Sequence, residues 1–226
     1  MVPVESPSSF QLAIDSLWPL LQALLTGTIP LTAASFAIGI IVALFAALAR
    51  ISNIWILRSI AATYISIIRG TPLLLQLFII FYGLPAFGLV FDPWPSAILA
   101  FSLNVGGYAA ETIRAAILSI PKGQWEAAAT VGLNRSQTLR RVILPQATRV
   151  AIPPLSNTLI SLVKDTSLAS VVLVTEIFRT AQEIAGPTFE FFLMYALAGV
   201  YYWILSQLLA FGQSRIEKRL NRKVAH

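Results

Sequence analysis

The sequence has no cysteine and a single histidine, His226, at its last position. Disulfides, thiol nucleophiles and cysteine metal sites are therefore excluded, and we expect neither a histidine proton relay nor a metal centre. The phosphate-loop pattern G-x-x-x-x-G-K-[ST] is absent as well, and no glycine precedes a lysine. The chain offers no nucleophile–base arrangement, so a membrane enzyme is the weakest interpretation. Any ATP hydrolysis would occur on another polypeptide.

Charged residues are scarce, at 12% of the 226 residues, whereas hydrophobic residues make up 57%. Soluble domains carry about a quarter charged residues, so the composition predicts an all-α integral membrane protein. We expect one transmembrane domain over residues 1–226. No Lys or Arg precedes Arg50, so we expect no cleavable secretory signal, which needs a basic start. The net charge of +6 then reflects where basic residues lie relative to the membrane, not a nucleic-acid partner.

Five apolar stretches are long enough to cross a membrane, which takes roughly 20 residues. The first predicts either one long helix or a surface helix followed by a span broken near Pro30. In the second, Pro72 is expected to kink or restart the helix. Between the last two, residues 173–187 predict a short helix and a turn at Gly186–Pro187. The stretches cover 17–49, 59–82, 96–119, a fourth that begins after Pro153–Pro154, and 189–211.

Small residues recur every four positions in the first stretch, at Ser35, Gly39, Ala43 and Ala47. This spacing places them on one face of a helix. Small side chains allow helix backbones to approach closely in a membrane, so the pattern predicts a packing surface.

Basic residues fix the expected orientation. Segments 50–58, 120–149 and 215–223 hold two, five and five of the sixteen basic residues, whereas Arg179 is the only one in 83–95 and 173–188. Because cytoplasmic loops are enriched in Lys and Arg, the first three segments are expected inside the cell. Glu5 and Asp15 make the N-terminal tail acidic, which suits an outward position. We therefore predict five spans with the N-terminus outside and the C-terminus inside.

The basic loop after the third stretch is predicted to form two short helices. The first, around 123–131, is rich in alanine and should end at Gly132. The second should follow Asn134 or Ser136 as N-cap and should end or kink near Pro145. Composition alone would favour a solvated loop that happens to be helical.

The spacing in that loop resembles the EAA motif of ABC-importer permeases: Glu126-Ala127-Ala128, then Gly132, then Val142 and Leu144-Pro145. The family has isoleucine where this chain has Val142. The resemblance implies that residues 122–145 form a coupling loop whose first helix docks on an ATP-hydrolysing partner subunit, which would carry the ATP and Mg. Trp125 is expected to act as an apolar anchor at this interface.

The resemblance extends over about residues 12–222, through the runs IIRGTPLLLQLFIIFYGLP, YAAETIRAAI and LISLVKDTSLA. These are similar to the polar amino-acid branch of ABC-importer permeases, and most similar to its L-cystine permeases. The resemblance implies a MetI-like fold in the bacterial inner membrane, a second permease copy or paralogue, and an external amino-acid-binding protein. Glutamine, histidine, arginine and glutamate remain alternative substrates. A secondary transporter or passive channel is a further alternative, although neither would need a docking loop.

Polar side chains inside the apolar stretches are the candidates for a substrate path. We assign this role to Gln76, Asn104, Tyr108 and Asn157, although hydrogen bonding between helices would explain each equally well. The ionisable candidates either line a water-filled path or form structural ion pairs. Glu111 and Arg114 can pair at i, i+3, and Arg69 is expected to need Glu111 as its anionic partner. The ionisable set is Arg69, Glu111, Arg114, Lys164 and Asp165.

Overall fold

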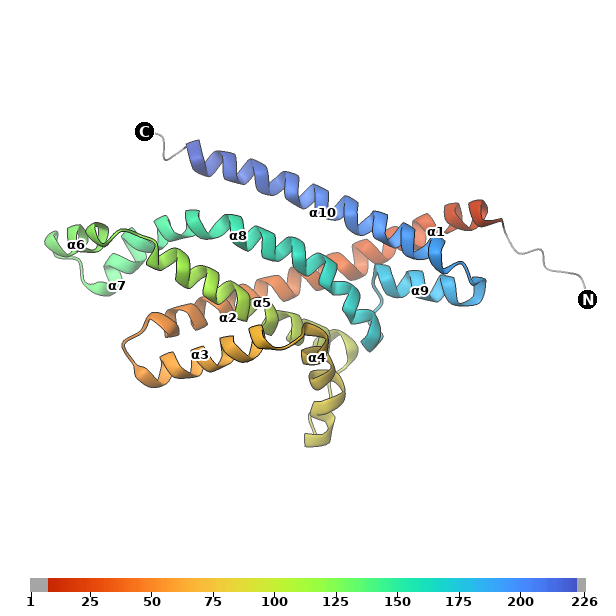
Figure 1. Cartoon of the computed structure of the whole chain (residues 1–226), viewed down its shortest axis with the longest axis horizontal. Coiled ribbons are helices and arrows are strands. Elements are labelled where there is room, and N and C mark those ends of the chain that lie inside the picture. The colour runs from red at the N-terminus through yellow and green to blue at the C-terminus, as the bar shows by residue number, and fades with distance from the viewer. Residues whose placement is uncertain (1–7, 223–226) are drawn as a thin grey trace, which may run out of the picture.

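The computed structural model describes residues 8–222, so Glu5, Lys223 and His226 lie outside the described residues. Within this range all regular secondary structure is helical, and no strand occurs. The molecule is an elongated bundle (Figure 1): the α6–α7 loop and the end of α10 lie at one tip, and the N-terminal end of α1 and α9 lie at the other. The helices are α1 Ser9–Ala23, α2 Ile29–Ile51, α3 Trp55–Gly70, α4 Leu73–Phe78, α5 Pro93–Leu118, α6 Lys122–Thr130, α7 Arg135–Thr138, α8 Leu144–Asp165, α9 Ile177–Thr188 and α10 Phe191–Arg222.

The first apolar stretch forms one continuous helix, Ser9–Ile51, of 43 residues. At 1.5 Å per residue it is about 65 Å long, roughly twice the apolar thickness of a bilayer. Pro30 does not break it, which settles the alternative left open by the sequence. Ser35, Gly39, Ala43 and Ala47 are all buried, and α2 packs most extensively against α5. The predicted packing face is therefore confirmed.

Three π-helical turns explain why several prolines do not end their helices. In each turn the last residue lies two positions before a proline, namely Pro30, Pro85 or Pro145. A proline ring in an α-helix collides with the carbonyl four residues earlier. That carbonyl falls inside the wider π-turn every time, which moves it away from the ring. The turns are Leu24–Thr28, Ile79–Gly83 and Leu139–Ile143.

Of the two alternatives predicted for Pro145, a helix end is wrong, because a π-turn leads directly into α8, and the helix of the fourth stretch begins before Pro153–Pro154. Where its membrane span begins stays a prediction. Helix α8 starts at Leu144 and runs through both later prolines to Asp165. The fixed φ of proline suits a helix, and its cost is the lost bond to the carbonyl four residues earlier. Here those carbonyls belong to Arg149 and Val150, which are both exposed. The turn expected at Gly186–Pro187 is also displaced, to Phe189, which has a φ of 59°.

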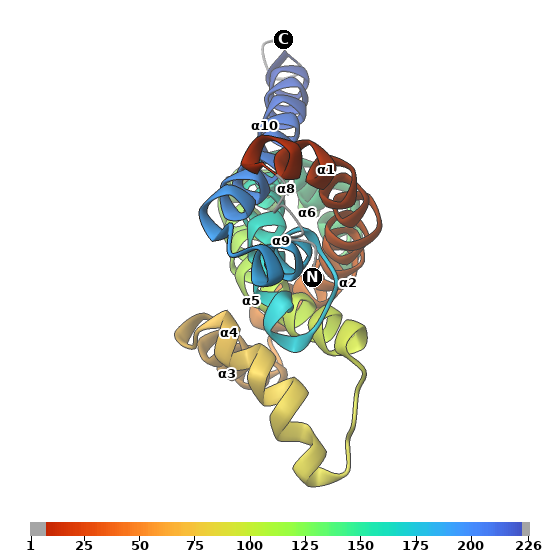
Figure 2. The same cartoon turned by 90° about the vertical axis from the view of Figure 1, so that its right-hand side faces the viewer.

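The prediction for Pro72 is confirmed. Helix α3 ends at Gly70, and the chain from Leu73 to Phe87 leaves it at an angle of 109°. As a result α3 and α4 form an arm that projects from the round cross-section of the bundle (Figure 2).

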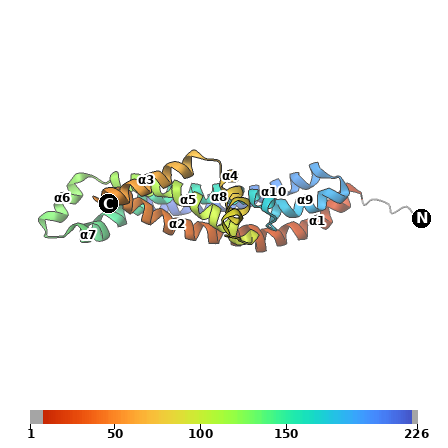
Figure 3. The same cartoon turned by 90° about the horizontal axis from the view of Figure 1, so that it is seen from below.

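Three buried clusters divide the length of the molecule. The central one joins α2, α5, α8 and the 3-10 helix Thr166–Val172. A second joins α1, α9 and the start of α10, and a third joins the end of α5 to the start of α8 and carries the α6–α7 loop. Seen from below, the elements that carry the two outer clusters, α1 with α9 and the α6–α7 loop, lie at opposite ends of the molecule (Figure 3).

By length and composition, the described helices include two candidate membrane spans, Ser9–Ile51 and Phe191–Arg219. Two bent pairs qualify if each is counted as one span, Trp55–Gly70 with Leu73–Phe87 and Arg135–Val172 with Ile177–Thr188. The remaining predicted span, 96–119, corresponds to α5 of 26 residues at the centre of the bundle. The count of five spans stays a prediction.

Candidate functional site

A cleft of about 430 Å³ opens where the α3–α4 break, the middle of α5 and the second half of α8 meet. This volume falls in the range of roughly 300–1,000 Å³ that is usual for small-molecule sites. Asp165 is the only ionisable side chain in its described wall apart from the phenol of Tyr108. The polar lining comprises Thr71, Asn104, Tyr108, Asn157, Thr158, Ser161 and Asp165.

Three of the four residues assigned to a substrate path line this cleft. Asn104 and Tyr108 reach it from α5, and Asn157 reaches it from α8. The fourth, Gln76, does not: it is 8% exposed and lies behind Asn104, whose Nδ2 donates to Gln76 Oε1 at 3.0 Å. The structure thus separates the four residues into three that form the wall and one that supports it.

The wall of the cleft follows the helical repeat. Asn104 and Tyr108 lie four residues apart on α5, and Asn157, Ser161 and Asp165 lie four apart on α8. Side chains at this spacing share one helix face. Ser161 was not predicted, although its position midway between Asn157 and Asp165 in an apolar helix was a usable signal.

Asp165 and Lys164 do not form the pair that their adjacency suggests. Two ion pairs occur among the described side chains, those of residues 8–219, and neither includes them. Neighbouring residues on a helix point about 100° apart. Asp165 therefore reaches the cleft, whereas Lys164 is exposed and lies outside the cleft lining.

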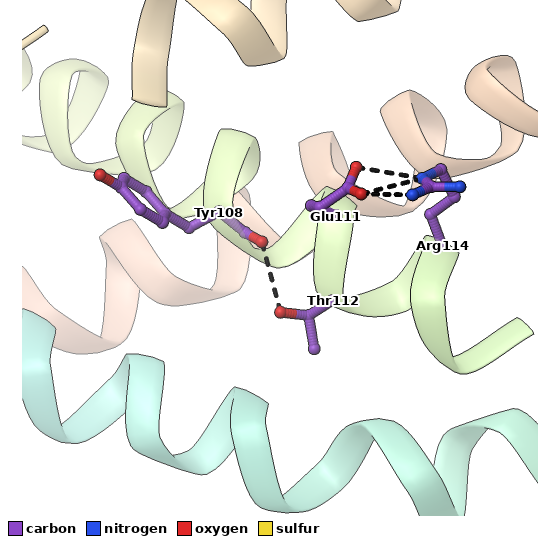
Figure 4. A network of polar contacts seen from close by, with 4 residues as sticks. All are labelled: Tyr108, Glu111, Thr112 and Arg114. Carbon is purple, nitrogen blue, oxygen red and sulfur yellow. Dashed lines mark hydrogen bonds and ion pairs between the residues drawn. The ribbon is translucent and has the colours of Figure 1, made fainter. Parts of the chain in front are cut away.

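Glu111 pairs with Arg114 on α5, as the i, i+3 spacing predicted (Figure 4). Arg114 Nε donates to the two carboxylate oxygens at 3.1 and 3.0 Å, and a terminal guanidinium nitrogen adds a further contact. The predicted Arg69–Glu111 pair is wrong. Arg69 is exposed at the end of α3, and its Cζ lies 5.7 Å from the centre of the Tyr108 ring, at the rim of the cleft. A contact with an aromatic face takes the place of the carboxylate.

The loop after α5 matches its predicted local structure. Helix α6 ends at Thr130, and Gly132 has a φ of 80°, the left-handed conformation that only glycine adopts without strain. Asn134 caps α7 by accepting from the Gln137 backbone N–H at 3.0 Å. The Gln137 side chain in turn accepts from the Asn134 backbone N–H, at 3.0 Å. These contacts fix the direction in which the loop returns towards α8.

Residues of this loop divide into an outer and an inner face. Glu126, Ala127 and Pro145 are exposed. Ala128, by contrast, is buried at 4% exposure, and Trp125 is half-buried against the end of α5 and the start of α8. Leu144 belongs to the same inner packing. Trp125 thus packs against its own chain and remains partly exposed, and its role as an anchor at a partner interface stays a prediction.

Comparisons with known proteins agree with this architecture. The family model described as "Binding-protein-dependent transport system inner membrane component" matches residues 35–222. The L-cystine transport system permease protein TcyB of Bacillus subtilis (strain 168) is 58% identical over 217 residues, which cover 96% of this chain and 93% of TcyB.

Solved structures are similar over almost the whole chain. The "Crystal structure of an amino acid ABC transporter with histidines" superimposes with a TM-score of 0.86 at 33% identity, covering 92% of this chain and 97% of that one. An inward-facing MetNI methionine ABC transporter superimposes with a TM-score of 0.70 at 22% identity, over 95% and 99% of the two chains. At this identity the second likeness concerns the fold alone.

Proposed function

The chain belongs to the family of binding-protein-dependent transport system inner membrane components, and we propose that it forms the translocation path for L-cystine. It is a permease subunit of an ABC amino-acid importer, a multi-pass protein of the inner membrane with an all-helical MetI-like fold. The family implies an ATPase and a binding protein as partners. The choice of L-cystine rests on the 58% identity to TcyB over 96% of the chain.

The cleft has the chemistry that a zwitterionic amino acid requires. Its only carboxylate, Asp165, would take the substrate ammonium, and Asn157 and Tyr108 supply polar groups for the substrate carboxylate. Arg69, over the Tyr108 ring, adds positive charge at the rim. Hydrogen bonds that involve a charged group contribute more than neutral ones, so these few groups suffice to orient the substrate.

The remaining parts of the proposal concern assembly. The exposed face of α6, with Glu126 and Ala127, docks on a separate ATPase that binds ATP and Mg, and a second permease copy or paralogue completes the path. The chain crosses the membrane five times with its N-terminus outside. The placement of the α2–α3 turn, the α6–α7 loop and the end of α10 towards one tip supports this orientation (Figure 1).

ATP-driven uptake by the reconstituted complex tests the substrate. The permease, its ATPase and the external binding protein are placed in liposomes, and labelled L-cystine, glutamine, histidine and arginine are compared. We expect L-cystine to enter preferentially. Asp165→Asn should lower its uptake about tenfold or more, because the ammonium loses a charged partner, whereas the adjacent Lys164→Gln should change it little. Preferential uptake of another amino acid would refute the assignment of L-cystine.

A further inference from the structure

The end of α3 leaves backbone carbonyl groups without amide partners. Thr71 is extended, with φ −125° and ψ 147°, and Pro72 has no N–H, so the last turn of α3 lacks its usual donors. Two side chains replace them. Thr71 Oγ1 donates to the Ile67 carbonyl at 2.8 Å, and Gln76 Nε2 donates to the Ile68 carbonyl at 2.8 Å.

The direction of every hydrogen bond at Gln76 is fixed. Gln76 Nε2 also lies 3.1 Å from the Thr71 carbonyl and 2.9 Å from Thr71 Oγ1, whose own proton is already given to Ile67. Carbonyl oxygens only accept, so the nitrogen of this amide must face them and its oxygen must face the other way. That oxygen, Oε1, meets Asn104.

Asn104 is thereby oriented as well. Because Gln76 Oε1 can only accept, Asn104 must donate with Nδ2, as observed at 3.0 Å. The acceptor that Asn104 has left for the cleft is its carbonyl oxygen, Oδ1, beside the second N–H of Nδ2. A reversed Asn104 amide would set its oxygen against Gln76 Oε1, and two acceptors facing each other at this partly buried contact would both lose a hydrogen-bond partner.

We propose that Gln76 is a positioning residue that sets the hydrogen-bond polarity of the cleft, so that Asn104 presents an acceptor to the ammonium group of the substrate. The identity of the ligand in this inference rests on the proposed function. The orientation of the Gln76 and Asn104 amides rests on the hydrogen bonds alone. Asn104 Oδ1 and the Asp165 carboxylate are then two acceptors in the cleft for a cationic group.

Asn157 provides a matched comparison, since its amide is held in the opposite sense. Its Oδ1 accepts from Gln213 Nε2 at 3.0 Å, and the same nitrogen donates to Glu217 at 2.9 Å. A carboxylate at position 157 can still accept from Gln213, whereas a carboxylate at position 104 would face the oxygen of Gln76. The same substitution should therefore have different effects at two positions of one cleft.

The first test uses no substrate. Asn104→Asp and Asn157→Asp are each made with Glu217→Gln, which removes the carboxylate near Gln213, and the purified permease–ATPase complexes are melted at pH 8. Asn104→Asp should lower the melting temperature by about 5 °C or more, and Asn157→Asp by less than about 2 °C. Equal shifts, or a larger loss for Asn157→Asp, would overturn the assigned polarity.

The second test measures recognition. Displacement of labelled L-cystine from the complex, without the external binding protein, is compared for cystamine, which has only ammonium groups, and 3,3′-dithiodipropionate, which has only carboxylates. In Gln76→Leu the preference for cystamine should fall about tenfold. In Gln146→Leu it should stay unchanged; that amide joins the Val142 carbonyl to Gln124 outside the cleft.

An unchanged preference in Gln76→Leu would overturn the role of Gln76 even if L-cystine binds normally. If the native complex binds no L-cystine but the two aspartate variants melt as expected, the polarity stands and the proposed substrate fails.

Discussion

The packing of α2 against α5 leaves no room for a side chain at Gly39. A Cβ built on Gly39 would lie 2.6 Å from Val105 Cγ1, 2.7 Å from Val105 Cβ and 3.0 Å from the Ser102 carbonyl oxygen. Carbon atoms in contact normally stand about 3.5–4.0 Å apart, so Gly39→Ala must push the two helices apart or move Val105.

The expected cost follows from two opposing effects. Overpacking a core by a methyl group costs typically ~1–3 kcal/mol, and the contacts at Gly39 place this change at the upper end. Replacing glycine by alanine inside a helix returns up to ~1 kcal/mol. We expect Gly39→Ala to destabilise the protein by about 2 kcal/mol, which corresponds to a melting temperature lower by roughly 4–8 °C.

A matched variant separates the two effects. At Gly199, in α10, a Cβ would meet nothing within 4 Å. Gly199→Ala should therefore keep only the gain in helix propensity and raise the melting temperature slightly. The assay is thermal unfolding of the purified complex in detergent. Combining Gly39→Ala with Val105→Ala should recover part of the loss, because the variants share one contact. Strictly additive losses, or a Gly39→Ala protein as stable as the native one, would refute the reasoning.

Three other predictions address the loop, the cleft and the topology. Gly132→Val forces a β-branched residue into a φ of 80°, and Ala127→Glu adds a charge to the exposed face of α6. Both variants should insert normally into the membrane, yet the ATPase activity of the complex should no longer respond to the loaded binding protein. A normal response would leave this loop without a coupling role. In the native chain Tyr108 is 44% exposed and Gln76 is 8% exposed. A thiol-specific, water-soluble reagent should therefore label Tyr108→Cys much faster than Gln76→Cys, and substrate should slow the labelling of Tyr108→Cys. Equal labelling rates would contradict the assignment of Tyr108 to the wall of the cleft and of Gln76 to its support. An epitope at 88–92 should be reached by antibody from outside the cell, and labelling only after permeabilisation would contradict the five-span topology.

Local rules predicted a large part of the fold because several elements depend on a few neighbouring residues. The break at Pro72, the left-handed Gly132 and the cap at Asn134 all follow from backbone chemistry within one turn. The Glu111–Arg114 pair follows from spacing on a single helix. The packing face of α2 was predictable because the four-residue repeat of small residues has one geometric reading.

The errors concern properties that depend on neighbouring helices. Pro145 predicts a helix end or a kink because a single sequence shows the penalties of proline but not the π-turn before it, which lets the helix continue. Arg69 reads as a buried charge until the arm of α3 and α4 leaves the bundle and exposes it. Gln76 is polar for a structural reason, and its place behind Asn104 is set by the direction that α4 takes after Pro72.

The π-turn at Leu139–Ile143 has a consequence for the tolerated length of the chain. Such a turn holds one residue more than the α-helical path requires. If one residue were deleted within it, the segment could close as ordinary α-helix while everything after it keeps its orientation, so Asn157, Ser161 and Asp165 would still face the cleft. A deletion in the regular part of α8 before Asn157 would instead rotate these residues by about 100° and carry them off the cleft. Deletions in the turn should thus give inserted permeases with an intact wall, and their cost should come from the collision of the Pro145 ring with the carbonyl four residues earlier, which the wider turn now avoids.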